Sequence, residues 1–291
     1  MRNLNPPAAD IPLLLNQEAD GAGWPLLIWM GEAGYLTNDL VALRYYRTPW
    51  GVRTASYRLS QLARWGLITR RPLRQLRQVW HLTEQGARLL AEHLCTTPRA
   101  LGYDGREAYV HESRISHGLA LTELQVALEI HGSRTGGLLS RFIREPLIQT
   151  EAGPLRPDAA LVYTNSARTW NYTVELDRNT ETPMYVAATK VPRYDGMARS
   201  GTWQLVWEQM PTCLVVVAAG GSARVRRLKA AIDAMPVSEG DYRLFKLVAT
   251  EELCGLPPSY RGALPVVETR FEQSVCLVAM KPETERRAVL G

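Results

Sequence analysis

A stretch rich in arginine and free of acids constrains this chain more than any other feature. Residues 40–83 contain nine arginines and no aspartate or glutamate. A solvated face normally interleaves acids among its bases, because like charges repel one another. The run therefore favours a surface that binds a polyanion such as DNA, because arginines that neutralise phosphates release the counterions bound to them. The alternative, a solvated basic face in a chain that simply prefers arginine to lysine, stays open.

The same stretch has the order helix, turn, helix and hairpin. Asn38 or Asp39 is expected to cap the first helix, and Thr48-Pro-Trp-Gly51 has the residues of a turn. The later elements are predicted as a helix over 52–65, strands near 67–71 and 79–82 joined by a basic loop, and a helix from Thr83. This order predicts a winged helix-turn-helix, which reads the major groove with its second helix and carries a basic wing beside it.

The predicted second helix has two distinct sides. Helical spacing at about 100° per residue groups Val52, Ala55, Leu59 and Leu62 on a side expected to face the core. Arginine on the other side can also take guanine bidentately. The residues expected to bind DNA on that side and on the wing are Arg53, Tyr57, Ser60, Arg64, Arg70, Arg71, Arg74 and Arg77.

The charge is concentrated at one end of the chain. Residues 1–100 hold twelve Arg, no Lys and seven acids, a net charge of +5 that equals the net charge of the whole 291-residue chain. A chain of this length is long enough for two domains. The predicted division is a flexible arm at 1–22, a winged-helix DNA-binding domain at 23–97, a linker at 98–110 and an α/β domain at 111–291.

Several classes of protein are disfavoured by what the sequence lacks. The four cysteines are far apart and form no C-x-x-C pair, which disfavours zinc and disulfides. No apolar run approaches the ~20 residues of a membrane span, and no signal peptide is apparent. No P-loop for a nucleotide and no His-x-His pair for a relaxase-type metal site occurs. We expect a cytoplasmic, nucleoid-associated protein without a membrane partner.

The second half has the pattern of an α/β domain with a mixed sheet. A helix is predicted at 113–131, ended by Gly132, Gly136 and Gly137. A helix entered through Thr182-Pro183 is expected to bend or stop at Pro192. Strands are predicted at 138–148, 159–163, 170–177, 212–218, 242–250 and 274–280, with another helix at 222–235. Helices between strands place this half in the α/β class.

Acidic residues and a lysine recur where these strands should meet. Glu175 and Asp177 alternate along one strand and so project from the same face, and Asp158 precedes the neighbouring strand. Three converging carboxylates repel unless a cation neutralises them, and Mg²⁺ or Mn²⁺ favours such oxygen ligands. Lys190 on the next helix is placed to reach the same cleft. These four are the catalytic candidates for phosphodiester cleavage; surface ion pairs with nearby arginines are the alternative.

The motifs together resemble the replication-relaxation family of plasmids and mobile elements. The resemblance rests on the winged segment, a helix around His117, R-P-D-A at 156–159, V-E-L-D-R at 174–178 and K-x-x-R-Y ending at Tyr194. It implies a winged helix followed by a restriction-endonuclease-like, PD-(D/E)xK-type domain, with Asp158 and Glu175 as its acids. Asp177 stands where that motif has lysine, and Lys190 is a candidate replacement. Glu123 is a weaker acidic candidate, and His117 is expected to pack or cap.

Three functions stay open at this point. The first is a double-stranded DNA-binding protein of a plasmid or mobile element, acting in replication, relaxation or transfer, with metal-dependent nicking. The second is a winged-helix transcriptional regulator whose degenerate second domain dimerises or binds an effector. The third is a scaffold that recruits a relaxase or replication protein. A homodimer is expected, because DNA readers of this kind often meet two half-sites.

Overall fold

The structure is a computed structural model that describes residues 10–16, 23–74, 78–103, 105, 110–150, 152–217, 220–236 and 245–249. The chain divides into two compact units, Met1–Val126 and Ala127–Gly291. The division falls within helix α6 (Glu112–Thr135), whereas the sequence suggests a linker at 98–110. No helix in these ranges is both long and apolar enough to cross a membrane. The strand predicted at 274–280 lies outside the described residues.

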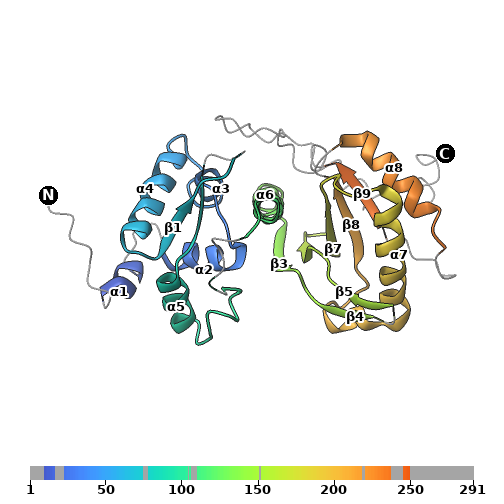
Figure 1. The fold of residues 1–291 in the computed structure, drawn as a ribbon, viewed down its shortest axis with the longest axis horizontal. Helices are drawn as coiled ribbons and strands as arrows, with labels where there is room; N and C mark the ends of the chain where they lie inside the picture. The colour runs from blue at the N-terminus through green and yellow to red at the C-terminus, as the bar shows by residue number, and fades with distance from the viewer. Residues whose placement is uncertain are drawn as a thin grey trace. The chain divides into compact units, whose positions relative to one another are not determined.

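The first unit contains the predicted winged helix-turn-helix (Figure 1). Leu36 pairs with Trp80, so a third short segment joins the hairpin of the wing. The elements are α1 (Ile11–Asn16), α2 (Gly23–Ala33), α3 (Asn38–Tyr45), α4 (Gly51–Arg64), β1 (Ile68–Arg71), β2 (Val79–Leu82) and α5 (Glu84–His93). Ala55, Leu59 and Leu62 fix α4 by burying one of its faces in the core.

Three local predictions in this unit are corrected. Thr37 caps α3, since its hydroxyl accepts from the Leu40 N–H at 3.2 Å, while Asn38 accepts from the Trp80 indole at 2.8 Å. Val52 is 44% exposed rather than buried, although Ala55, Leu59 and Leu62, predicted on the same side, are all buried. Part of the expected flexible arm is the helix α1, which buries Ile11 and Leu15 and packs against α2.

The second unit has the mixed sheet that the sequence predicts. Its order is β3-β6-β7-β8-β9, with β3, β6 and β7 antiparallel and β7, β8 and β9 parallel. The strands of this sheet are β3 (Leu138–Arg144), β6 (Ala159–Thr164), β7 (Thr169–Asp177), β8 (Thr212–Val217) and β9 (Phe245–Ala249). The predicted strand at 138–148 ends earlier, and Ile148–Thr150 (β4) pairs instead with Gly153–Leu155 (β5).

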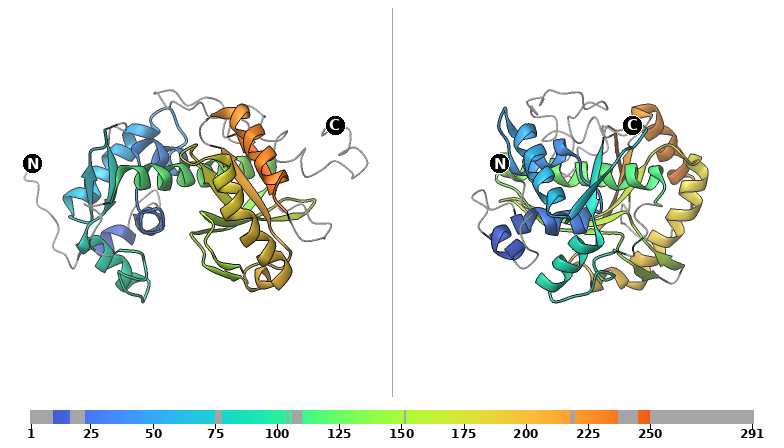
Figure 2. Two further views of the ribbon diagram at one scale, coloured as in Figure 1. Left: turned by 45° about the vertical axis from the view of Figure 1, so that its right-hand side comes forward. Right: turned by 60° about the vertical axis from the view of Figure 1, so that its left-hand side comes forward.

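Helices α7 (Pro183–Ser200) and α8 (Gly221–Asp233) pack side by side on one face of this sheet (Figure 2). The core on that face contains Tyr194 and Met197 of α7, Leu228 of α8, and Cys213 and Val215 of β8. Leu161, Val174 and Leu176 are buried on the other face. The short 3-10 helix η3 (Thr202–Leu205) follows α7.

Two helix ends in this unit differ from expectation. Thr182 caps α7, and Pro183 occupies its first turn, as predicted, but the helix continues through Pro192 to Ser200. A proline inside a helix removes one hydrogen bond, and packing of both flanking turns compensates here, since Val191 and Tyr194 are fully buried. Helix α6 likewise runs through Gly132 to Thr135 and ends at Gly136, whose φ is +73°.

Candidate functional site

The exposed side of α4 is the first candidate site. Arg53, Tyr57, Ser60 and Arg64 are all exposed there, at the helical spacing that places them on one side. Arg53 and Arg64 make no hydrogen bond or ion pair with the described part of the chain. Their guanidinium groups therefore stay available to an outside anion.

The predicted wing residues have different surroundings. Arg74 is exposed, and Arg70 lies over the Trp80 ring at 5.4 Å and donates to Gln78 Oε1 at 3.4 Å. Arg71 is half-buried and donates to the Val110 carbonyl at 2.7 Å, because successive residues of β1 point to opposite sides. Arg71 therefore holds the chain after α5, an internal role that the sequence did not indicate. Arg77 lies outside the described residues.

An aromatic residue missed by the sequence reasoning belongs to the same exposed side. Trp50, directly before α4, is 71% exposed. Residues three and seven positions apart share a helix face, so Trp50 lies in line with Arg53 and Tyr57. The alternation of aromatic and basic residues in the sequence was the available signal. We call Trp50, Arg53, Tyr57, Ser60 and Arg64 the α4 stripe.

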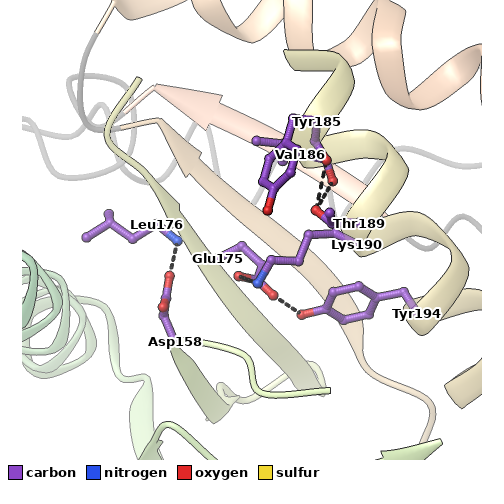
Figure 3. Close-up of polar contacts among 8 residues, drawn as sticks. All are labelled: Asp158, Glu175, Leu176, Tyr185, Val186, Thr189, Lys190 and Tyr194. Carbon is purple, nitrogen blue, oxygen red and sulfur yellow. Dashed lines mark hydrogen bonds and ion pairs between the residues drawn. The ribbon is translucent and has the colours of Figure 1, made fainter. Parts of the chain in front are cut away.

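The second candidate site centres on Glu175 of β7. Lys190 Nζ donates to Glu175 Oε2 at 2.7 Å, and Tyr194 Oη donates to Glu175 Oε1 at 2.9 Å (Figure 3). Both partners come from α7, one helical turn apart, so they meet the same carboxylate. Glu175 and Tyr194 are buried, whereas the Lys190 side chain is 29% exposed and connects the group to solvent.

Asp158 lies just before β6 and is fixed by the backbone of β7. Its Oδ2 accepts from the Leu176 N–H at 2.7 Å, and its own N–H donates to the Val174 carbonyl at 2.9 Å (Figure 3). These two bonds place the Asp158 carboxylate beside β7, near Glu175. The structure thus brings together Asp158, Glu175 and Lys190, as the sequence predicts.

Burial and charge set the protonation of this group. Burial raises the pKa of the Glu175 carboxyl to about 7; the charge of Lys190 opposes the rise, and that of Asp158 adds to it. Burial acts to lower the pKa of the Lys190 amine, but the charge of Glu175 and the hydrogen bond to it outweigh that effect and leave the pKa raised. Lys190 is therefore a cation at neutral pH. A further positive charge near Glu175 would lower the pKa of its carboxyl and favour the ionised form.

Asp177 does not join this group, so the predicted convergence of three carboxylates is wrong. Both of its oxygens accept from Arg224 of α8, at 2.8 Å from Nε and 2.9 Å from Nη2. Arg224 is 1% exposed and also donates to the Glu181 carbonyl at 2.8 Å. A buried guanidinium takes a carboxylate bidentately, so Asp177 joins β7 to α8. The described residues contain no group of three or more His, Cys, Asp or Glu side chains arranged to hold a metal.

Two sequence candidates remain, Glu123 and His117. Glu123 and His117 both belong to α6 within the first compact unit, where Glu123 is exposed and His117 half-buried. Asp158, Glu175 and Lys190 all belong to the second.

The Asp158–Glu175–Lys190 group suits a hard divalent cation with two carboxylate ligands rather than three. Each oxygen of Glu175 already accepts one hydrogen bond and retains further acceptor capacity. The charge of Asp158 raises the pKa of Glu175, and a cation between the two would relieve that repulsion. Mg²⁺ commonly uses one or two protein carboxylates and keeps its other positions for water and phosphate.

Comparison with known proteins agrees with the sequence interpretation. No curated protein matches the chain. Among solved structures, that of the restriction endonuclease FokI is similar over 94% of this chain and 48% of that one, with 12% identity and a TM-score of 0.29. The chain thus spans about half the length of that structure, and the fold assignment stands on the element and strand order above. The family model described as replication-relaxation matches residues 27–211, more than half of the chain. The chain belongs to the replication-relaxation family.

Proposed function

We propose that this protein binds double-stranded DNA through the α4 stripe and the wing, in the replication, relaxation or transfer of a plasmid or other mobile element. The observation that carries the proposal is the exposed side of α4, where Arg53 and Arg64 lie without internal ion pairs in a segment that has no acid. Such charges displace counterions from phosphate. Helix α4 is the second helix of a helix-turn-helix, the one that enters the major groove.

The test is duplex binding by the full chain at several salt concentrations, measured by fluorescence anisotropy. Arg53→Ala and Arg64→Ala are expected to weaken binding, and removing one phosphate-binding arginine reduces the slope of log K against log salt by about 0.9. Arg88→Ala is the matched control, because Arg88 is an exposed arginine of α5 paired with Glu84. Unchanged affinity in both α4 variants at two salt concentrations contradicts the proposal.

A second proposed activity is cleavage of one DNA strand at the Asp158–Glu175–Lys190 group. It is favoured by a lysine ammonium 2.7 Å from a buried carboxylate that has a second carboxylate nearby. Asp158 and Glu175 would hold a Mg²⁺ or Mn²⁺ ion. A bound cation of this kind polarises a phosphate oxygen and lowers the pKa of its water.

The chain's own residues have separate roles in this proposal. Lys190, the partly exposed member, would stabilise negative charge on the phosphate while remaining paired with Glu175. Tyr194 holds one Glu175 oxygen from the buried side, so the carboxylate cannot rotate freely. The Leu176 N–H fixes Asp158 in the same way.

Supercoiled plasmid incubated with Mg²⁺ or Mn²⁺ tests this activity. Nicking is expected in the wild type and should disappear in Asp158→Ala and Glu175→Ala. Mn²⁺ binding, measured by electron paramagnetic resonance without DNA, should weaken in the same variants. Duplex binding without nicking or Mn²⁺ binding would instead favour a transcriptional regulator whose second unit serves dimerisation or effector binding.

A further inference from the structure

Trp50 is the most exposed aromatic residue in the described part of the first unit, and the phosphate contacts proposed for the α4 stripe give it no role. Its side chain is 71% exposed, although a residue of this size normally contributes to a core or an interface. Tyr57, further along the α4 stripe, is 63% exposed, and Val52 in the first turn of α4 is 44% exposed. The tip of α4 therefore presents apolar surface to its surroundings.

The backbone at this tip is held in one place. A Cβ on Gly51 would lie 1.8 Å from the Tyr46 carbonyl oxygen, so only glycine permits this close approach of α4 to the end of α3. The Gly51 N–H donates to Thr48 O at 2.9 Å, and the Thr54 N–H and hydroxyl donate to Trp50 O at 3.1 and 3.3 Å. Trp50 is thus presented by a fixed turn.

The surroundings of Trp50 identify the occupant of this surface. Arg53 and Arg64 share the α4 stripe with Trp50, and the segment 40–83 has no acid, so every charged side chain that this segment adds to the surface is basic. A protein partner with an ordinary mixture of charges would leave these guanidinium groups uncompensated. Duplex DNA offers phosphates for the arginines and, in the major groove, one apolar group, the C5 methyl of thymine.

We propose that Trp50 reads thymine, packing its indole against the thymine C5 methyl when α4 enters the major groove. Residues at the N-terminal end of a recognition helix are those that contact base edges, and Trp50 directly precedes the first residue of α4. The inference rests on the proposed DNA binding. It adds a source of sequence specificity that phosphate contacts cannot supply.

The experiment tests thymine recognition by Trp50 separately from duplex binding itself. Duplexes are first selected from a random library with the full-length protein, and each thymine of the selected site is then replaced by deoxyuridine, which lacks only the methyl. At the thymine that Trp50 contacts, wild-type affinity should fall about fourfold, the value of one methyl removed from an apolar contact. Trp50→Ala should bind the thymine and uracil duplexes equally, and Trp50→Phe should retain part of the difference.

Controls distinguish a local contact from a fold defect. Leu205→Ala removes an apolar side chain that is 85% exposed in the second unit, and it should leave the uracil effect intact. Circular dichroism of Trp50→Ala should match the wild type, since the side chain has no role in the core. A uracil effect that is absent in the wild type, or equally large in Trp50→Ala, overturns the inference while salt-dependent binding still supports the proposed function. No binding to any duplex overturns both.

Discussion

The charged residues of the two candidate sites differ in burial and pairing. On α4 of the first unit, Arg53 and Arg64 are exposed and have no internal partner among the described residues. In the second unit the charges on β7 are buried and paired, Glu175 with Lys190 and Asp177 with Arg224. Exposed charges contribute little to folding and remain available to a ligand. Buried pairs are costly to break, so they fix geometry.

The largest effect expected from this contrast is at the Asp177–Arg224 pair. Arg224→Ala leaves a buried carboxylate without its bidentate partner and frees the Glu181 carbonyl. Breaking a buried pair in this way typically costs about 3–5 kcal/mol. Urea unfolding followed by circular dichroism, with hydrogen exchange in the β7 and β8 peptides, measures this destabilisation.

Two controls show whether the destabilisation comes from the unpaired charge. The double variant Asp177→Leu with Arg224→Met removes both charges and should recover much of the stability, because an apolar pair can replace a buried ion pair. Lys229→Ala breaks the exposed pair with Asp233 on the same helix and should cost less than about 1 kcal/mol. Equal destabilisation by Arg224→Ala and Lys229→Ala would remove the contrast between buried and exposed charge.

The next effect tests the first unit, where backbone fit rather than charge is expected to set stability. Gly51→Ala places a methyl against the Tyr46 carbonyl and must move α4 away from α3. Overpacking of this kind costs about 1–3 kcal/mol, and duplex affinity should fall with it because the α4 stripe shifts. Thermal unfolding and anisotropy measure the two effects.

Gly118→Ala provides the matched substitution. Gly118 is also helical, but a Cβ there meets nothing within 4 Å. Alanine is the better helix former by up to about 1 kcal/mol, so this variant should be neutral or more stable. A neutral Gly51→Ala would show that the turn before α4 adapts, and the fixed presentation of Trp50 would no longer hold.

A smaller effect is the pH dependence that Glu175 gives to the second unit. Its pKa is about 7 in the folded state, against an ordinary value of 4.5. The folded state therefore binds this proton more tightly, and the stability it contributes is complete below about 4.5 and is lost as pH rises through about 7. The free energy of unfolding of the wild type, relative to Glu175→Gln, should fall over this window, by no more than the roughly 3 kcal/mol that a rise in pKa from 4.5 to about 7 corresponds to. Urea unfolding at several pH values measures it, with the exposed acid Glu208 replaced by glutamine as control. A relative stability that rises with pH would show that the Lys190 pair outweighs burial.

Local pattern and long-range packing explain which of these features could be read from the sequence. The turn at Thr48–Gly51, the exposed side of α4 and the Thr182 cap depend on residues close in sequence, and all were predicted. Asp177 was misassigned because its partner, Arg224, is 47 residues away on α8, and no spacing rule connects them. Arg71 was predicted as a DNA contact from its place on the wing, and its bond to the Val110 carbonyl, 39 residues away, could not be predicted from local pattern. Whether a charged side chain is exposed or paired depends on residues that are distant in sequence, and only the folded structure shows which of these lie nearby.

The smallest expected change in stability is also the sharpest test of the contrast. Arg53→Gln and Arg64→Gln remove charges that are exposed and have no acid nearby in sequence, so neither should destabilise the first unit. Relief of repulsion among the arginines should instead leave stability unchanged or raise it by up to about 0.5 kcal/mol, while duplex affinity falls. Thermal unfolding at low and high salt measures the first quantity, because salt screens the repulsion and should shrink the difference from the wild type. If removing these charges leaves the unit as stable or more stable and weakens DNA binding, the arginines serve ligand binding and not folding. If the free energy of unfolding falls by more than about 1 kcal/mol in either variant, the arginines stabilise the fold instead.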